Sequence, residues 1–276
     1  MFVSRKYDGT LEPGLSTLFF VNDTGSAITC AHVANIIAQL ETINNTFAAF
    51  KAERALIPAG KGERAMLQSL EAKYGYKKNS VIELLILVPA VGDTTSLSWV
   101  NHDRLDLAIV TFVGLANKQY SSHATFINEP AKIKAGKYLC RYGYPFPEFS
   151  NYRVNPETDA LEWTNDGSSN VPSFPLDGII TRYIGTSQQV DGIEMSTPGL
   201  KGQSGGPLFD EDGLVYGMQF ATNHLHLGFD IKDFPITTEQ GKKEKVSDSA
   251  FLHVGHCVHV DRIKEFLQQN NVAFFE

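Results

Sequence analysis

The chain has 276 residues, of which 42% are apolar and 20% are charged, and its formal net charge is −7. This composition supplies a sizeable core and excludes wholesale disorder, a membrane span, and nucleic-acid binding through a basic surface. Three cysteines are too few for a disulfide framework, and the first nine residues lack the apolar core of a signal peptide. We therefore expect a soluble, reduced, cytoplasmic protein.

Most of the chain is predicted to be β structure. Short runs rich in Val, Ile, Phe and Thr alternate with Gly, Pro, Asn and Asp, as in all-β proteins. The first two runs, 15–21 and 26–30, flank Asn22-Asp23-Thr24-Gly25 and predict a hairpin. Further strands are predicted at 81–88, 107–113, 138–142, 178–184, 193–196, 208–209, 214–221 and 251–260.

Two segments have helical rather than β periodicity. Apolar residues recur at steps of three and four over 33–50, and a shorter stripe follows at 66–74. These stripes predict a helical hairpin at about 34–76, inserted into the β protein. A last helix is predicted after Asp261, which can cap its first turn.

Two polar stretches are predicted to be surface loops. Residues 145–175 are rich in proline, Asn and Ser and have no clean periodicity. Residues 230–249 include Gly241-Lys242-Lys243-Glu244-Lys245, a charged run of the kind that usually lies in solvent.

The run Gly202-Gln203-Ser204-Gly205-Gly206 has a clear mechanical interpretation. A serine flanked by glycines can lie on a tight turn with its hydroxyl exposed. The backbone N–H groups of Gly202 and Ser204 can then converge on one point and form an oxyanion hole. Losing one such donor costs roughly 100- to 1000-fold in turnover. A strand and a turn follow directly, which excludes a flexible linker.

His32 and Asp106 supply what a serine nucleophile lacks. A free hydroxyl needs a base, and the base needs a carboxylate that fixes its tautomer. His32 lies in Thr29-Cys30-Ala31-His32-Val33, at a predicted strand-to-helix junction, and Asp106 precedes an apolar strand. Each residue alone is weak evidence. In the order His, Asp, Ser they predict a catalytic triad.

Together the segments 29–33, 106–110 and 202–208 resemble the trypsin/chymotrypsin-like serine peptidases, most closely the disulfide-poor HtrA-like branch. The resemblance implies an all-β fold of two antiparallel six-stranded β-barrels (chymotrypsin-like). Residues 1–125 would form the first barrel, with the helical insertion, and residues 126–276 the second, with the C-terminal helix. The two barrels would form one catalytic unit.

The resemblance also implies the chemistry. Ser204 would attack a peptide bond and form an acyl-enzyme, His32 would transfer the proton, and Asp106 would orient His32, with no metal or organic cofactor. Residue 203 is Gln where trypsin-type enzymes have an Asp that binds a newly cut N-terminus. We therefore do not expect activation by N-terminal insertion. Only 270–276 follow the last helix, so no PDZ-like module is expected.

The family register also places a substrate pocket. Pro198 would form its base beside Gly199, and Phe220-Ala221-Thr222 would form its wall. An uncharged base argues against selection of Lys or Arg, because a buried cation needs a partner. Thr222 should narrow the entrance. We expect small or medium apolar residues before the scissile bond.

Several alternatives stay open at this stage. The chain could be a catalytically silent peptide-binding module, or an esterase that uses the same triad. A metal site formed by the clustered His253, His256, Cys257 and His259 is less favoured, because His256 would point to the opposite face of the strand.

The expected partners are a protein or peptide substrate, with a regulatory protein or a homo-oligomer also possible. The sequence excludes nucleic acid and membrane as partners. The helical hairpin is either a decoration or a partner surface, and 145–175 could gate access to the site.

Overall fold

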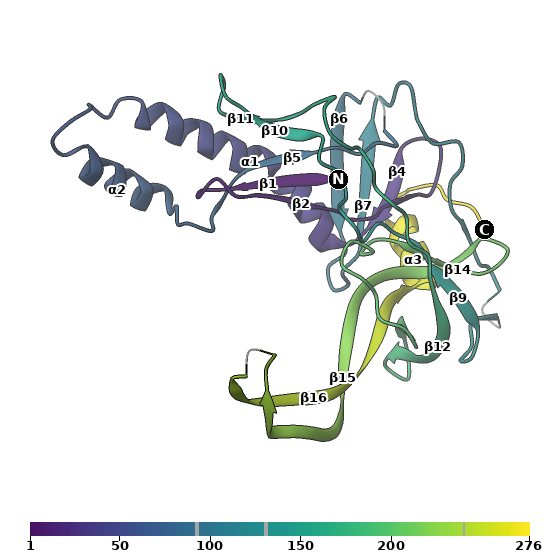
Figure 1. Cartoon of the computed structure of the whole chain (residues 1–276). Coiled ribbons are helices and arrows are strands. Elements are labelled where there is room, and N and C mark those ends of the chain that lie inside the picture. Colours follow the sequence, from purple (N-terminus) through teal and green to yellow (C-terminus); the bar gives the residue numbers. More distant parts are fainter. Residues whose placement is uncertain (92–93, 130–131, 240) are drawn as a thin grey trace.

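The computed structural model describes residues 1–91, 94–129, 132–239 and 241–276 (Figure 1). The helices are α1 (Ala31–Arg54), α2 (Glu63–Tyr74) and α3 (Val260–Gln269). The strands are β1 (Phe2–Lys6), β2 (Leu11–Gly14), β3 (Phe19–Phe20), β4 (Ser26–Thr29), β5 (Val81–Ile86), β6 (Ser96–Asn101), β7 (Ala108–Val113), β8 (Thr125–Phe126), β9 (Tyr138–Arg141), β10 (Tyr152–Asn155), β11 (Ala160–Trp163), β12 (Leu176–Gly185), β13 (Val190–Met195), β14 (Pro207–Phe209), β15 (Leu214–Thr237) and β16 (Lys243–His259). The described chain is therefore mostly β, as the sequence predicts.

A four-stranded antiparallel sheet in the order β3-β4-β7-β6 places two of the predicted site segments side by side. Thr29, at the end of β4, pairs with Ala108, at the start of β7. The residues just after β4 and just before β7 therefore meet at one edge of the sheet. His32 and Asp106 are among them, although 74 positions separate them in the sequence.

The predicted helical hairpin is confirmed as α1 and α2, and it packs against the three-stranded sheet β2-β1-β5. The side chain of Asn44 on α1 exchanges two hydrogen bonds with the backbone of Leu84 on β5. Phe47, Phe50 and Leu70 are buried in the same apolar cluster. These contacts fix the hairpin to the sheet.

A larger sheet has the order β14-β9-β12-β13-β16-β15-β8. β14 also pairs with β15, so the pairing from β14 through β9, β12, β13, β16 and β15 returns to β14. One apolar core joins this sheet to the four-stranded one. It contains Cys30 and Leu107 from one side and Leu208 and Met218 from the other.

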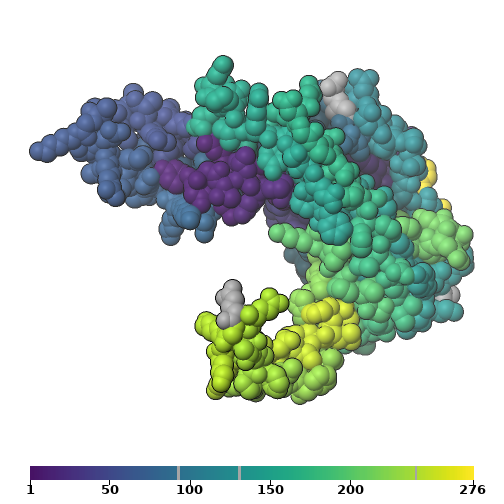
Figure 2. Space-filling model, in the orientation of Figure 1, coloured from purple at the N-terminus to yellow at the C-terminus, as the bar shows by residue number. Residues whose placement is uncertain are grey.

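The segment 230–249 was expected to be a loop, and this expectation is wrong. Most of it belongs to β15 and β16, which extend as a two-stranded arm from the body (Figures 1 and 2). All three register shifts between these strands lie on β15. The extra residues interrupt the alternation of apolar and polar side chains, so the sequence pattern looks irregular although the strand continues.

Two smaller expectations also need correction. The segment 145–175 was expected to be an irregular loop, but it contains the hairpin β10-β11, whose turn includes Asp159 at a φ of 49°. The last helix is capped by His259, not Asp261. The His259 ring accepts a hydrogen bond from the backbone N–H of Asp261, which lies in the first turn.

None of the helices in the described ranges has the combination of length and apolarity needed to cross a membrane.

Candidate active site

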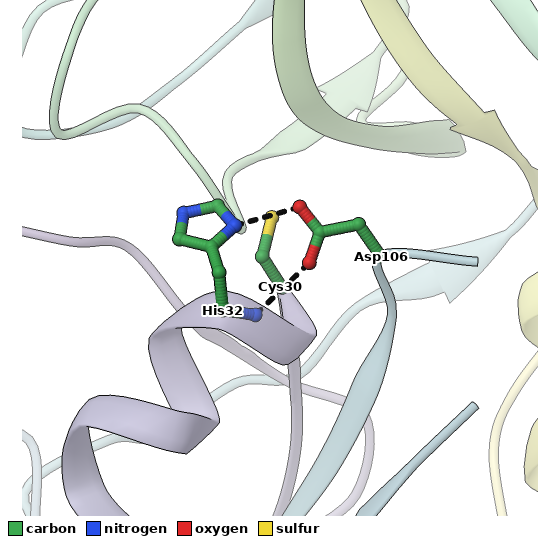
Figure 3. Close-up of side chains that lie close together, drawn as sticks. All are labelled: Cys30, His32 and Asp106. Atoms are coloured by element: carbon green, nitrogen blue, oxygen red, sulfur yellow. Dashed lines mark hydrogen bonds and ion pairs between the residues drawn. The ribbon is translucent and has the colours of Figure 1, made fainter. Parts of the chain in front are cut away.

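His32 and Asp106 are bonded at two points (Figure 3). His32 lies in the first turn of α1, directly after the end of β4. Its backbone N–H donates to Oδ1 of Asp106 at 3.0 Å, and its Nδ1 lies 2.6 Å from Oδ2. An ionised carboxylate only accepts hydrogen bonds, so Nδ1 is the donor. Nε2 of the neutral ring is then the basic nitrogen, and it points away from Asp106.

The surroundings of Asp106 favour its ionised form. Partial burial alone would raise the pKa of this carboxyl. Hydrogen bonds from the ring and the backbone of His32, with one from the backbone of Ala31, outweigh burial and lower the pKa below its usual value. The carboxylate is therefore charged at neutral pH and holds the His32 ring in one tautomer.

Ser204 lies on a turn that only glycines can form here. Gly202 and Gly205 have φ values of 95° and 85°. A Cβ at Gly205 would lie 2.1 Å from the carbonyl oxygen of Thr17, and one at Gly202 would lie 2.4 Å from that of Tyr144. Any side chain at either position would therefore push the backbone apart.

Thr17 holds this turn from one side. Its backbone N–H donates to the carbonyl oxygen of Ser204 at 3.0 Å, and its hydroxyl donates to that of Gly202 at 2.8 Å. Within the described part of the chain, the backbone N–H groups of Gly202 and Ser204 donate to no acceptor. These are the two groups that the sequence predicts as an oxyanion hole.

Gln219 and Thr17 each form hydrogen bonds with both the His32 segment and the Ser204 turn. The carbonyl oxygen of Gln219 accepts from the backbone N–H of Gly205 at 2.9 Å and from the Cys30 thiol at 3.4 Å. The carbonyl oxygen of Thr17 accepts from the Thr29 hydroxyl at 2.8 Å. Among the described residues, no hydrogen bond joins the Ser204 hydroxyl to His32 directly. Such bonds are often long or poorly aligned without substrate.

Cys30, His32 and Asp106 bring three potential metal-ligand atoms within 4.8 Å of one another (Figure 3). These atoms already bind other groups, since Nδ1 of His32 is bonded to Asp106 and the thiol donates to Gln219. Burial, and then the charge of Asp106, raise the pKa of the Cys30 thiol well above its ordinary value. A metal needs the thiolate, so this donor set fits a metal poorly.

The histidines near the chain end do not form a second such group within the described ranges. His253 contacts His224 on the arm, His256 lies 3.3 Å from a carboxylate oxygen of Glu194, and His259 caps α3. Each ring therefore has a different neighbour.

The predicted pocket residues lie around one small region. The Thr222 hydroxyl donates to the carbonyl oxygen of Gly199 at 2.7 Å, which joins the predicted wall to the predicted base. The carbonyl oxygen of Ala221 accepts from the side chain of Gln219, and the Phe220 ring packs beside His256. The carbonyl oxygen of Pro198 accepts from Arg141 at 3.1 Å.

Arg141 and Gln219 are the residues of this region that sequence reasoning missed. The guanidinium of Arg141 donates to Gln219 and to the backbone at Thr197 and Pro198. One signal could have found Arg141. It lies two residues after the buried Leu139 on the same strand, so its side chain points to the same, interior face.

Gln203, which stands where a trypsin-type Asp would be, is fully buried and bonded within the chain. Its side-chain oxygen accepts from the backbone N–H of Leu200 at 2.9 Å, and its side-chain nitrogen donates to the carbonyl oxygen of Phe174 at 3.0 Å. It therefore stabilises the turn before Ser204.

A cavity of about 440 Å³ adjoins the site. It is lined mainly by apolar side chains from the N-terminal strands, from α1 and from the segment before β10, with Thr17, Leu18, Val33, Ile36 and Tyr144 among them. Thr17 also holds the Ser204 turn, and Val33 follows His32, so the cavity lies beside the candidate site.

Comparison with known proteins assigns the chain to a family. A family model described as a trypsin-like peptidase domain matches residues 16–218, a range that contains His32, Asp106 and Ser204. The chain therefore belongs to the trypsin-like peptidase domain family. No curated protein matches the chain.

Solved structures that match this chain include proteases. A structure of the HtrA-type protease AlgW with a decapeptide is 15% identical, covers 92% of this chain and 50% of its own, and has a TM-score of 0.45. The Rv3671c protease from M. tuberculosis in its active form is 13% identical, covers 100% of this chain and 81% of its own, and has a TM-score of 0.43. This chain spans about half the length of the AlgW chain. At such identities the family model is the basis of the assignment.

Proposed function

We propose that this chain is a serine endopeptidase that hydrolyses peptide bonds through an acyl-enzyme, with Ser204, His32 and Asp106 as its triad. The observation that supports this most is the two-point bond between His32 and Asp106, which leaves Nε2 of the ring as the base. Membership of the trypsin-like peptidase domain family supports the same chemistry.

This mechanism assigns a role to each group of the site. Nε2 of His32 takes the proton as Oγ of Ser204 attacks the carbonyl carbon, and Asp106 stabilises the resulting imidazolium. The N–H groups of Gly202 and Ser204 stabilise the oxyanion of the tetrahedral intermediate. His32 then gives its proton to the leaving amine. Water then attacks the acyl-enzyme. Nε2 of His32 takes a proton from this water and gives it to Oγ of Ser204 as the acyl–oxygen bond breaks, so no cofactor takes part.

We also propose the two-barrel architecture, with residues 1–125 and 126–276 as the two halves of one catalytic unit. The closed pairing from β14 round to β15 supports a second barrel. For the first half, the support is the four-stranded sheet β3-β4-β7-β6, which brings His32 and Asp106 together where β4 ends and β7 begins.

The proposed substrate is a protein or peptide with a small or medium side chain before the scissile bond. The bond between Thr222 and Gly199 across the pocket supports the limit on size. The expectation that this side chain is apolar depended on a pocket whose innermost residue, Pro198, carries no charge. Arg141 alters that premise, because its guanidinium binds the carbonyl oxygen of Pro198.

One experiment separates the peptidase from the two other candidate functions. The wild type, Ser204→Ala and the exposed-serine control Ser187→Ala are treated with a fluorophosphonate probe and then given a denatured protein. We expect labelling and cleavage in the wild type and the control, and neither in Ser204→Ala. Labelling without cleavage, together with turnover of simple esters, would favour an esterase. Absence of labelling in the wild type would favour a peptide-binding module.

A further inference from the structure

Arg141 is a fully buried cation whose hydrogen-bond partners are all uncharged. Its side chain lies on β9 and has no exposed surface. Nη1 donates to the side-chain oxygen of Gln219 at 2.7 Å. Nη2 donates to the carbonyl oxygens of Thr197 and Pro198 at 2.9 and 3.1 Å, and also to the Thr197 hydroxyl.

No carboxylate of the described residues forms an ion pair with this guanidinium. Among the residues that the structure describes, the guanidinium bonds only to amide, carbonyl and hydroxyl oxygens, and its buried Nε has no acceptor. The charge of Asp177 raises the pKa of the guanidinium, but burial has the larger effect, and Asp177 is itself exposed. Burial lowers the pKa of the guanidinium, but arginine stays protonated in proteins. Buried charges are ordinarily paired, so this one lacks its counter-charge.

The guanidinium lies at the predicted base of the substrate pocket. A Cβ at Gly255 would be 2.0 Å from Nη1 of Arg141 and 2.7 Å from the carbonyl oxygen of Thr197. The missing side chain of Gly255 therefore provides the space that the guanidinium fills. Gly255 pairs with Thr222 between β16 and β15, and Thr222 forms the predicted wall.

Gln219 connects this cation to the nucleophile. Its side chain accepts from Arg141 and lies where a Cβ at Gly199 would be, 2.3 Å from the amide nitrogen. Its carbonyl oxygen accepts from the residue next to Ser204. A side chain that enters between Thr222 and Gly199 would therefore meet Arg141 and Gln219 at the end of the pocket.

We propose that Arg141 determines specificity and makes this chain select an acidic side chain, glutamate or aspartate, before the scissile bond. This inference rests on the proposed peptidase function. The substrate carboxylate supplies the missing counter-charge and accepts from the guanidinium, whereas an apolar side chain leaves the charge uncompensated and a lysine repels it. The guanidinium is covered in the free chain, so substrate entry displaces the Thr222 hydroxyl from its single bond to Gly199.

The test compares peptides that differ only in the residue before the cleaved bond: Glu, Gln, Asp, Asn, Leu and Lys. We expect kcat/KM for Glu over Gln, and for Asp over Asn, to be higher by about 10- to 100-fold, the range for a charge-assisted hydrogen bond. Lys should be the poorest substrate. Equal rates for Glu and Gln, or a preference for Leu, would overturn the proposal with the wild type alone.

Variants of Arg141 test whether the preference for an acidic residue depends on this side chain. Arg141→Gln should bring the Glu-to-Gln ratio close to one whatever its absolute rate, and Arg141→Lys should retain part of the preference. Arg153→Gln, which removes an exposed arginine that pairs with Glu162 on the β10-β11 hairpin, should leave the ratio unchanged. Fluorophosphonate labelling of Ser204 separates two failures. Labelling and cleavage without preference for acids would refute this proposal only, whereas absence of both would also refute the peptidase function.

Discussion

At the scale of single residues, the Asp106 carboxylate binds both the backbone and the ring of His32, which fixes the ring's position as well as its tautomer. Chain order and residue type were enough to predict this contact. Arg141 could not be predicted in the same way, because its meaning depends on the backbone oxygens of Thr197 and Pro198 and on the absence of a side chain at Gly255. Those neighbours come together only in the folded chain.

The Asp106 carboxylate can be tested by removing its charge. We expect Asp106→Asn to lower kcat by about 10⁴-fold, as in other triads, because an amide can hold the ring in the wrong tautomer. The matched control is Asp103→Asn, which alters an exposed aspartate three positions earlier. Peptide hydrolysis assays give the rates. A loss smaller than tenfold in Asp106→Asn would show that His32 does not depend on this carboxylate.

The three free cysteines should differ in reactivity. Cys30 and Cys257 are buried, and burial raises the pKa of the Cys257 thiol to about 12. Cys140 is only partly buried, and burial also raises its pKa. Native protein treated with iodoacetamide at pH 8 should therefore be modified first at Cys140, with the other two reacting after unfolding in guanidinium. Mass spectrometry of the peptides gives the order. Early modification of Cys30 would mean that the site opens in solution.

At the scale of elements, the helical hairpin could be predicted because its apolar residues recur with a clear period. The outer part of the arm has no such pattern and was not predicted. Over 33–50 the apolar stripe is regular enough to predict α1 from sequence. The inner parts of the arm's strands, 214–221 and 251–260, were predicted, but beyond them two further bulges on β15 shift the register against β16 and interrupt the strand pattern. The hairpin in 145–175 was missed because its two strands are short and flanked by proline.

The Ser204 turn should tolerate no side chain at Gly205. Gly205→Ala places a Cβ against the Thr17 carbonyl oxygen, a backbone atom that cannot easily move. We expect a loss of roughly 3 kcal/mol or more in the free energy of unfolding, together with loss of peptidase activity. Gly213→Ala is the control, since its φ is 78° but nothing lies within 4 Å of the new atom. That change should cost about 1 to 2 kcal/mol and leave activity unchanged. Urea unfolding curves compare them, and equal losses would contradict the close approach.

At the scale of the whole molecule, one core joins the part that holds His32 and Asp106 to the part that holds Ser204. Cys30 and Leu107 pack in the same cluster as Leu208 and Met218. The two parts that carry the candidate site therefore share one packed core, which fixes their positions relative to each other. The space-filling view shows a hollow between the arm and the part formed by the helical hairpin and the N-terminal strands (Figure 2).

The arm should be dispensable for folding. Among the described residues, the strands of its outer part pair only with each other, and many of its large apolar side chains are exposed, Phe229 and Phe234 among them. Replacing 227–250 by Asn-Gly would join the paired residues His226 and Phe251 through a two-residue hairpin. We expect the midpoint of thermal unfolding to change by no more than about 3 °C. A drop of more than about 10 °C would show that the arm stabilises the body.

The most direct measurement of the central claim is the mass and position of a covalent adduct. After reaction with a fluorophosphonate, peptide mapping by mass spectrometry should place one adduct on Ser204 in the wild type, with the rate of labelling greatly reduced in His32→Ala. An adduct on another residue, or equal labelling of Ser204 without His32, would contradict a nucleophile that depends on the His32–Asp106 pair.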